Sequence, residues 1–117
     1  ACAIDRGSLE NTRIGAHAML DNLCHIAHNV TIGAKSIISG QCGISGSATV
    51  GGGVAMGGQV GIAPHVSIGD GAVLTARSGV TKDVSAGEHV AGFPAVSSRQ
   101  FWRDQANIRR MRKSKPS

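Results

Sequence analysis

Two residues of this sequence, His28 and Gly46, have the types that could together carry out acyl transfer. An imidazole can take the proton from an attacking nucleophile. A corner glycine can adopt positive φ and expose its backbone N–H to an oxyanion, because no side chain stands in the way. Their residue numbers differ by 18, and the same step leads on to Pro64, followed by His65, and then to Lys82. We therefore predict that these residues line one edge of the molecule, although a solvated turn is the alternative interpretation of His28.

The other histidines and one carboxylate have weaker patterns. His25 falls on a flat strand, where we expect a packed or supporting residue, and His17 and His89 fall in turn or linker contexts, where we expect solvated side chains. Asp21 and Asn22 occupy the corner before His28. If corners of different subunits meet, a carboxylate there could orient an imidazole across the seam. Ordinary Asx-turn chemistry explains the pair equally well.

The 18-residue step follows from a six-residue repeat of aliphatic residues. This period matches neither an α-helix nor the alternation of a free strand. It fits a short strand followed by a tight corner, with three such units closing one triangular coil. We predict an all-β fold, a left-handed parallel β-helix of about four coils with a C-terminal α-helix. The repeated positions are Ile14, Leu20, Ile26, Ile32, Ile38, Ile44, Val50, Met56, Ile62, Ile68, Leu74 and Val80.

A second inward column lies two residues before the aliphatic one. Its members are small or branched, and successive coils should stack them about 4.8 Å apart. Cys24 and Cys42 belong to this column one coil apart, and we expect them to be stacked, reduced thiols of a cytosolic protein rather than a disulfide. The column comprises Cys24, Val30, Cys42, Ala48, Val54, Val60, Val66 and Ala72.

The repeat is interrupted at both ends, which suggests the domain limits. Ile4 is out of phase with Ile14, so we expect Arg6–Thr12 to form a loop that leaves the coils. Gly92 and Pro94 end the pattern, giving a β-helix domain over 1–91 and a linker with a basic helix over 92–117. The helix is expected over Gln100–Lys113, with apolar residues available to pack it back: Phe101, Trp102, Ile108 and Met111.

The positive charge is concentrated in this C-terminal segment. The net charge of the chain is +5, yet from Arg99 onward seven basic residues stand against Asp104 alone, whereas the preceding part has five basic and six acidic residues. Such a segment favours an acidic partner. Nucleic acid is a weak candidate, because the aromatic residues there are limited to Phe101 and Trp102. No apolar run is long enough for a membrane span, and the start has no signal-peptide pattern, so we expect no integral membrane contact.

Several motifs resemble those of the UDP-3-O-(3-hydroxyacyl)glucosamine N-acyltransferases of lipid A biosynthesis, a hexapeptide-repeat family. The sister O-acyltransferases share the element from His25 to His28, but they typically have Asn where Asp5 stands and end in a different helical domain. Family members also carry an N-terminal uridine-binding domain and earlier coils, so the resemblance is to their C-terminal half. The motifs are Ile4-Asp5-Arg6-Gly7, Asp21-Asn22, Ile26-Ala27-His28-Asn29, Gly43-Ile44-Ser45-Gly46-Ser47 and Phe101-Trp102-Arg103.

The resemblance implies a reaction and a role for each matching residue. The family moves an (R)-3-hydroxyacyl group from the 4'-phosphopantetheine thioester of acyl carrier protein to the 2-amine of the UDP-sugar acceptor. His28 matches the general base, the Gly46 N–H the oxyanion donor, and Asp21 the carboxylate that supports the base. His65 matches a second active-site histidine. Further substrate-binding positions are Asn22, His25 and Lys82.

The resemblance also implies partners and a location. We expect a homotrimer in the cytoplasm of a Gram-negative bacterium, with acyl carrier protein and a UDP-sugar acceptor as partners, no bound cofactor, no metal and no nucleic acid. The basic helix would dock the acidic carrier. The alternatives are a zinc site of the carbonic anhydrase type, built from His25, His28 and His65 across a subunit seam, a related hexapeptide O-acyltransferase, and a non-catalytic trimeric β-helix fragment.

Overall fold

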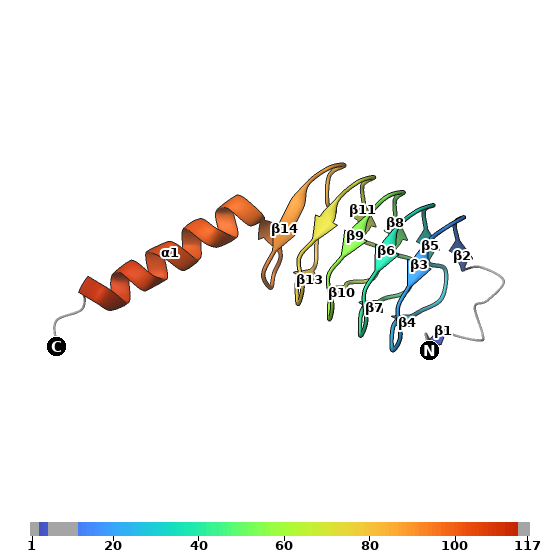
Figure 1. Cartoon of the computed structure of the whole chain (residues 1–117), viewed down its shortest axis with the longest axis horizontal. Coiled ribbons are helices and arrows are strands. Elements are labelled where there is room, and N and C mark those ends of the chain that lie inside the picture. Colours follow the sequence, from blue (N-terminus) through green and yellow to red (C-terminus); the bar gives the residue numbers. More distant parts are fainter. Residues whose placement is uncertain (1–2, 5–11, 115–117) are drawn as a thin grey trace.

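The computed structural model describes residues 3–4 and 12–114, and the structural statements below refer to them. Short strands form three sheets along a triangular prism, parallel except where β15 joins β14, and one helix follows (Figure 1). The strands are β1 (Ala3–Ile4), β2 (Arg13–Ile14), β3 (Met19–Leu20), β4 (His25–Ile26), β5 (Thr31–Ile32), β6 (Ile37–Ile38), β7 (Gly43–Ile44), β8 (Thr49–Val50), β9 (Ala55–Met56), β10 (Gly61–Ile62), β11 (Ser67–Ile68), β12 (Val73–Leu74), β13 (Gly79–Val80), β14 (His89–Ala91) and β15 (Val96–Ser97).

Each sheet forms one face of the prism. Face A has the order β1-β4-β7-β10-β13, face B has β11-β8-β5-β2, and face C has β15-β14-β12-β9-β6-β3. From β2 to β13, the numbers of paired residues differ by 18, as for His25 with Gly43 and Thr31 with Thr49. We call the edges between faces the AB, BC and CA edges, in chain order. The predicted left-handed parallel β-helix of about four coils with a C-terminal helix is confirmed.

The repeated aliphatic residues fill the interior because each strand has one inward and one outward position. The inward residues from Ile26 to Val80 are buried, as are Cys24, Val30 and the other members of the second column. Cys24 and Cys42 are free and buried, as expected. At each corner from β2 to β13 one residue has φ near +60°, the left-handed region that turns the chain sharply: His17, Leu23, Asn29, Lys35, Gln41, Ser47, Gly53, Gln59, His65, Gly71 and Arg77.

The first strand joins face A out of the regular step. Ile4 pairs with Ile26, a difference of 22 in residue number rather than 18, so the predicted change of phase is confirmed. Additional residues must therefore be accommodated before β2. Of the loop expected over Arg6–Thr12, only Thr12 lies within the described residues; its hydroxyl donates to the Ala27 carbonyl over 3.3 Å.

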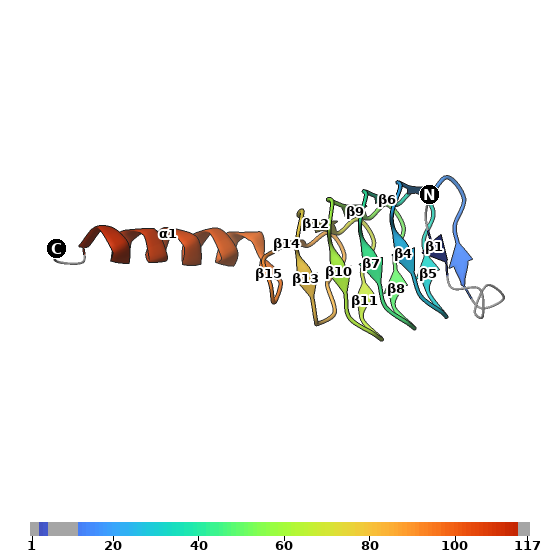
Figure 2. The same cartoon turned by 90° about the horizontal axis from the view of Figure 1, so that it is seen from below.

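Helix α1 (Ser98–Ser114) begins two residues earlier than predicted and ends one later. It begins there because the Ser97 hydroxyl accepts a hydrogen bond from the Gln100 N–H at 3.2 Å, an N-cap geometry. The expectation that its apolar residues pack it back is wrong except for Phe101, which lies against Gly92. Trp102, Ile108 and Met111 are exposed, because the helix projects away from the prism (Figures 1 and 2).

Candidate active site

The AB edge brings His28 and Gly46 into contact. His28 follows β4 and Gly46 follows β7, the neighbouring strand of face A. A Cβ atom on Gly46 would lie 2.7 Å from Nε2 of His28 and 2.9 Å from its Cε1. The imidazole therefore occupies the space that a side chain at residue 46 would need. The sequence predicted this neighbourhood from the 18-residue step alone.

The reason for a glycine at this corner differs from the expected one. Positive φ falls on the next residue, Ser47, at 63°, and not on Gly46. A residue with a side chain can therefore adopt the Gly46 backbone conformation. Glycine is required here because the His28 ring approaches the backbone closely, which is a packing reason rather than a conformational one.

The Gly46 N–H lies outside the hydrogen-bond ladder of the coils. Ser45 donates to the Ile62 carbonyl and Ser47 to the His28 carbonyl, but no described residue accepts a hydrogen bond from Gly46. The chain shows what this corner position can bind. At the equivalent Gly52, the N–H donates to Oδ1 of Asp70 at 2.9 Å. A corner N–H of this fold is thus able to bind an anionic oxygen, as oxyanion stabilisation requires.

His65 and Lys82 lie on the same edge, further along the prism. His65 is not in the His28 column itself, because Pro64 holds that position; its N–H donates to the Gly46 carbonyl at 3.1 Å. His65 has φ 63° and an exposed side chain, and Lys82 is also exposed. The structure therefore places these four predicted residues along one edge, and their chemical roles stay predictions.

Asp21 and Asn22 lie on the CA edge, at the opposite end of β4 from His28. Within one chain they are not brought beside the imidazole. Oδ1 of Asp21 accepts a hydrogen bond from the N–H of the next residue, Asn22, at 2.7 Å. An Asx turn joins the side chain to the N–H two residues on, so this bond is not the Asx turn that the sequence left open. If Asp21 supports His28, it does so from another copy of the chain, which is the seam arrangement considered from the sequence.

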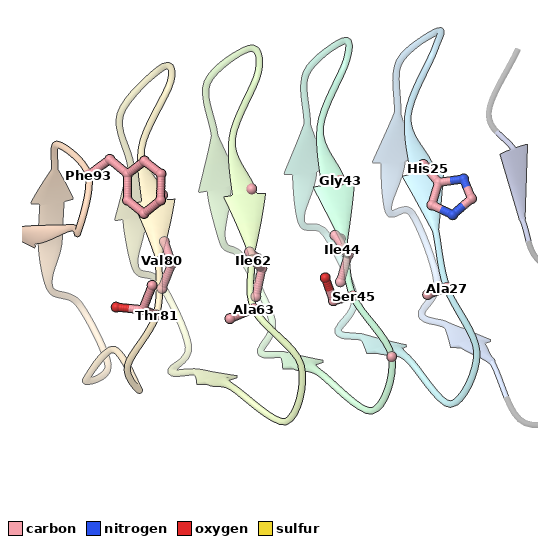
Figure 3. A pocket seen from close by; sticks show the side chains of 13 residues that line it. His25, Ala27, Gly43, Ile44, Ser45, Ile62, Ala63, Val80, Thr81 and Phe93 are labelled. Atoms are coloured by element: carbon pink, nitrogen blue, oxygen red, sulfur yellow. The ribbon is translucent and has the colours of Figure 1, made fainter.

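A groove of about 550 Å³ runs along the outer side of face A (Figure 3). Its floor is a column of outward strand positions without side chains: Gly43, Gly61 and Gly79. A Cβ on Gly43 or Gly61 would meet no atom within 4 Å, so the space above them is open. Phe93 stands at one end, with its ring 2.7 Å from the position of a Cβ on Gly79. The sequence prediction did not include this column, although the same step of 18 connects its three glycines.

Other histidines differ in how well they were predicted. His25 is not packed: it is exposed on β4 and lines the groove at the end away from Phe93 (Figure 3). Because no further layer of this chain covers the outer side of face A, the outward side chain of His25 stays exposed. His17 and His89 are exposed, as predicted. Within the described part of the chain, no three His, Cys, Asp or Glu residues gather as a metal site.

The electrostatic features outside this edge are simple. Burial raises the pKa of the Cys42 thiol above its ordinary value of 9.0, and the neighbouring Cys24 raises it further, while hydrogen bonds from the backbone oppose both effects.

Helix α1 presents its basic residues to solvent at the C-terminal end of the prism. No helix in the described residues is long and apolar enough to cross a membrane.

Comparison with known proteins gives a short close match and a longer structural one. Residues 11–46 match the family model described as bacterial transferase hexapeptide (six repeats). Over 28 residues the chain is 68% identical to the UDP-3-O-acylglucosamine N-acyltransferase of Maricaulis maris, a stretch that is 24% of this chain and 8% of the relative. The enzyme of that name from Pseudomonas syringae pv. tomato matches with the same figures. The predicted resemblance is confirmed over this stretch, which spans a small fraction of the curated relatives.

Solved structures with the same fold cover most of this chain. The UDP-N-acetylglucosamine O-acyltransferase of Moraxella catarrhalis is 32% identical with a TM-score of 0.78, over 89% of this chain and 43% of that protein. A serine acetyltransferase of Neisseria gonorrhoeae, solved with serine, is 28% identical with a TM-score of 0.70, over 74% of this chain and 39% of that protein. Both are acyl-group transferases by name, and both extend well beyond the part that this chain matches.

Proposed function

We propose that this chain is the C-terminal, donor-handling portion of an N-acyltransferase. It moves an (R)-3-hydroxyacyl group from acyl carrier protein to the 2-amine of a UDP-3-O-acylglucosamine in lipid A biosynthesis, in the bacterial cytoplasm. The observation that carries the proposal is the contact of the His28 imidazole with Gly46, beside an N–H that no described residue uses. The match to enzymes of that name supports the choice of substrates.

In this proposal the reaction is a direct transfer between amine and thioester. The acceptor nitrogen attacks the thioester carbonyl carbon, and His28 takes the proton that the nitrogen loses. The Gly46 N–H donates to the oxyanion that forms on the carbonyl oxygen. The carbonyl is restored as the carbon–sulfur bond breaks, which leaves the amide and the phosphopantetheine thiolate; the proton held by the imidazole can return to that thiolate. No step requires a metal or a bound cofactor.

The groove on face A fits the donor in this scheme. Its lining includes Gly46 on the AB edge, its floor lacks side chains, and Ile44, Ile62 and Val80 also line it. An extended chain can lie on the glycine column without displacing a side chain. The exposed basic helix α1 is proposed to dock acyl carrier protein, whose surface is acidic. Four further residues are then proposed to bind the substrates: Asn22, His25, His65 and Lys82.

A homotrimer is part of the proposal because one chain leaves two features incomplete. Asp21 and His28 lie on different edges, so a carboxylate–imidazole pair needs two copies. Face C also has an apolar outward column that one chain leaves uncovered: Met19, Ile37, Ala55 and Val73, of which Met19 is 63% exposed and Ile37 51% exposed. Burying such a column between subunits is favourable.

A second candidate function is transfer to a hydroxyl group by a related hexapeptide O-acyltransferase. The longer structural match, at 32% identity to the Moraxella O-acyltransferase, favours it. Mass spectrometry separates the two, because 3-hydroxyacyl carrier protein can be offered together with an acceptor that has a free 2-amine or a free 3-hydroxyl. An amide product supports the proposal, and an ester product supports the second candidate. A chain that forms neither product is the non-catalytic fragment.

A further inference from the structure

The CA edge carries a hydrogen-bonded ladder of side chains that ends in a cation. Nε2 of Gln59 donates to Oε1 of Gln41 at 2.7 Å, and Nε of Arg77 donates to Oε1 of Gln59 at 2.9 Å. The three residues follow the step of 18, and each has φ between 60° and 64°, so they leave the edge at equivalent positions. The ladder holds the Arg77 guanidinium by one nitrogen and thereby limits its freedom.

The remaining donors of this guanidinium are available. Among the described residues, no acceptor binds its Nη groups and no carboxylate pairs with Arg77. Asp70 and Asp83 lie on the other two edges, where they accept hydrogen bonds from the backbone N–H groups of Gly52 and Ser67. A held guanidinium with two free terminal nitrogens is suited to bind two oxygens of a phosphate group in a forked geometry.

The position of Arg77 indicates which phosphate. It stands on the CA edge two residues before Gly79, which lines the groove, and Lys82 stands on the AB edge of the same coil, across face A. Strand β13 of this coil lies between β7, the strand that Gly46 follows, and helix α1 (Figure 1). In a carrier-bound donor, the phosphate joins the arm to the carrier protein. It must therefore lie between the reacting thioester and the surface where the carrier docks.

We propose that Arg77, held by Gln59, binds the phosphate of the donor's 4'-phosphopantetheine arm. The inference rests on the proposed function for the identity of the donor and deepens it by naming a binding residue. Arg77 is a binding residue and not a catalytic one, because it lies away from the reacting atoms. Gln59 and Gln41 are positioning residues that act through it.

The test is a calorimetric titration of the chain with 4'-phosphopantetheine and with pantetheine, which lacks the phosphate. Arg77→Gln removes the charge and can extend the ladder, since Gln59 already bonds to Gln41 from the equivalent position. We expect this variant to weaken phosphopantetheine binding about tenfold and to leave pantetheine binding unchanged. Lys35→Gln is the matched control, because Lys35 is an exposed cation with φ 63° on the BC edge.

Arg77→Lys and Gln59→Leu test the ladder. Both keep a cation at residue 77 but remove its fixed geometry, so we expect an intermediate loss of phosphopantetheine affinity. The inference is overturned if wild-type protein does not bind phosphopantetheine, binds pantetheine equally well, or loses nothing in Arg77→Gln.

Acyl transfer measured in parallel separates this inference from the proposed function. Normal transfer with an unchanged KM for acyl carrier protein in Arg77→Gln would rule out the phosphate site at Arg77 and leave the N-acyltransferase proposal intact. Phosphate-dependent binding through Arg77 without any transfer product would support the site and count against the proposed reaction.

Discussion

Nε2 of His28 lies 2.7 Å from the point where a Cβ on Gly46 would be, so the imidazole and an alanine at residue 46 cannot both keep their places. Because the backbone of Gly46 does not need positive φ, Gly46→Ala should fold normally while displacing the ring. We expect transfer to fall about 100-fold, the usual cost of moving a catalytic group by about 1 Å. Steady-state kinetics together with circular dichroism would measure both effects.

Gly58→Ala provides the control for that substitution. Gly58 occupies the equivalent corner position on the CA edge, but its added Cβ would meet only the Gly40 carbonyl oxygen, at 3.5 Å. We expect folding and transfer to stay within twofold of wild type. An equal loss of activity in both variants would show that corner packing, and not the His28 contact, explains the effect.

The groove on face A predicts a size-dependent effect at Gly61. A Cβ there would meet no atom within 4 Å, and valine suits a strand, so the fold should tolerate Gly61→Val. The new side chain would obstruct the groove floor. We therefore expect this variant to reduce transfer of a long acyl chain about tenfold and to spare a short one.

Thr49→Val is the matched change on face B, at the same outward strand position but away from the groove. Competition between donors of two chain lengths, read by mass spectrometry, would give the ratio for each variant. The groove does not hold the acyl chain if the ratio of long-chain to short-chain product shifts equally in Thr49→Val, or does not shift in Gly61→Val.

The basic surface of α1 predicts a selective loss of carrier affinity. Arg109→Glu combined with Arg110→Glu reverses two exposed charges on a helix that contacts the prism only near β14 and β15. We expect the KM for acyl carrier protein to rise about fivefold at low salt, and less at high salt, because the attraction is screened. The KM for an acyl-phosphopantetheine donor without the carrier should not change. If both KM values rise together, α1 does not dock the carrier.

The raised pKa of Cys42 predicts a fall in stability at high pH. The thiol ionises in the unfolded chain before it ionises in the folded one, so the unfolded state releases a proton first as the pH rises. The free energy of unfolding should therefore fall as the pH rises above about 9.0. The free energy of unfolding of Cys42→Val should fall less steeply, because this variant lacks the thiol that titrates. Valine should fit there, since Val60 already occupies the same inward column. Denaturant unfolding at a series of pH values measures this, and identical curves for the two proteins would contradict it.

Much of the site could be predicted because the fold is a repeat. Once the hexads of Ile26, Ile44 and Ile62 define an 18-residue coil, residues whose numbers differ by 18 must lie side by side, and His28 must lie beside Gly46. The same rule would have found the glycines of face A, had the outward strand positions been aligned as the inward ones were.

What the period could not predict depends on side-chain size and on the ends of the repeat. The reason for Gly46 is the approach of the His28 ring, which a pattern of residue types does not contain. Phe93 reaches the groove from beyond the last regular coil. Helix α1 projects outward because, of the apolar residues expected to pack it, Phe101 alone lies against the prism. The 18-residue coil explains why strand β4 separates Asp21 from His28. A carboxylate–imidazole pair between these two residue positions would require a second copy of the chain.

The most direct test is acyl transfer itself. The chain, with and without His28→Ala, would be incubated with 3-hydroxyacyl carrier protein and UDP-3-O-acylglucosamine, and products would be read by mass spectrometry. We predict an amide on the 2-amine in the wild type and a loss of at least about 100-fold in the variant. Amide formation at an equal rate in both proteins would contradict the role of His28, and ester formation would contradict the proposed acceptor.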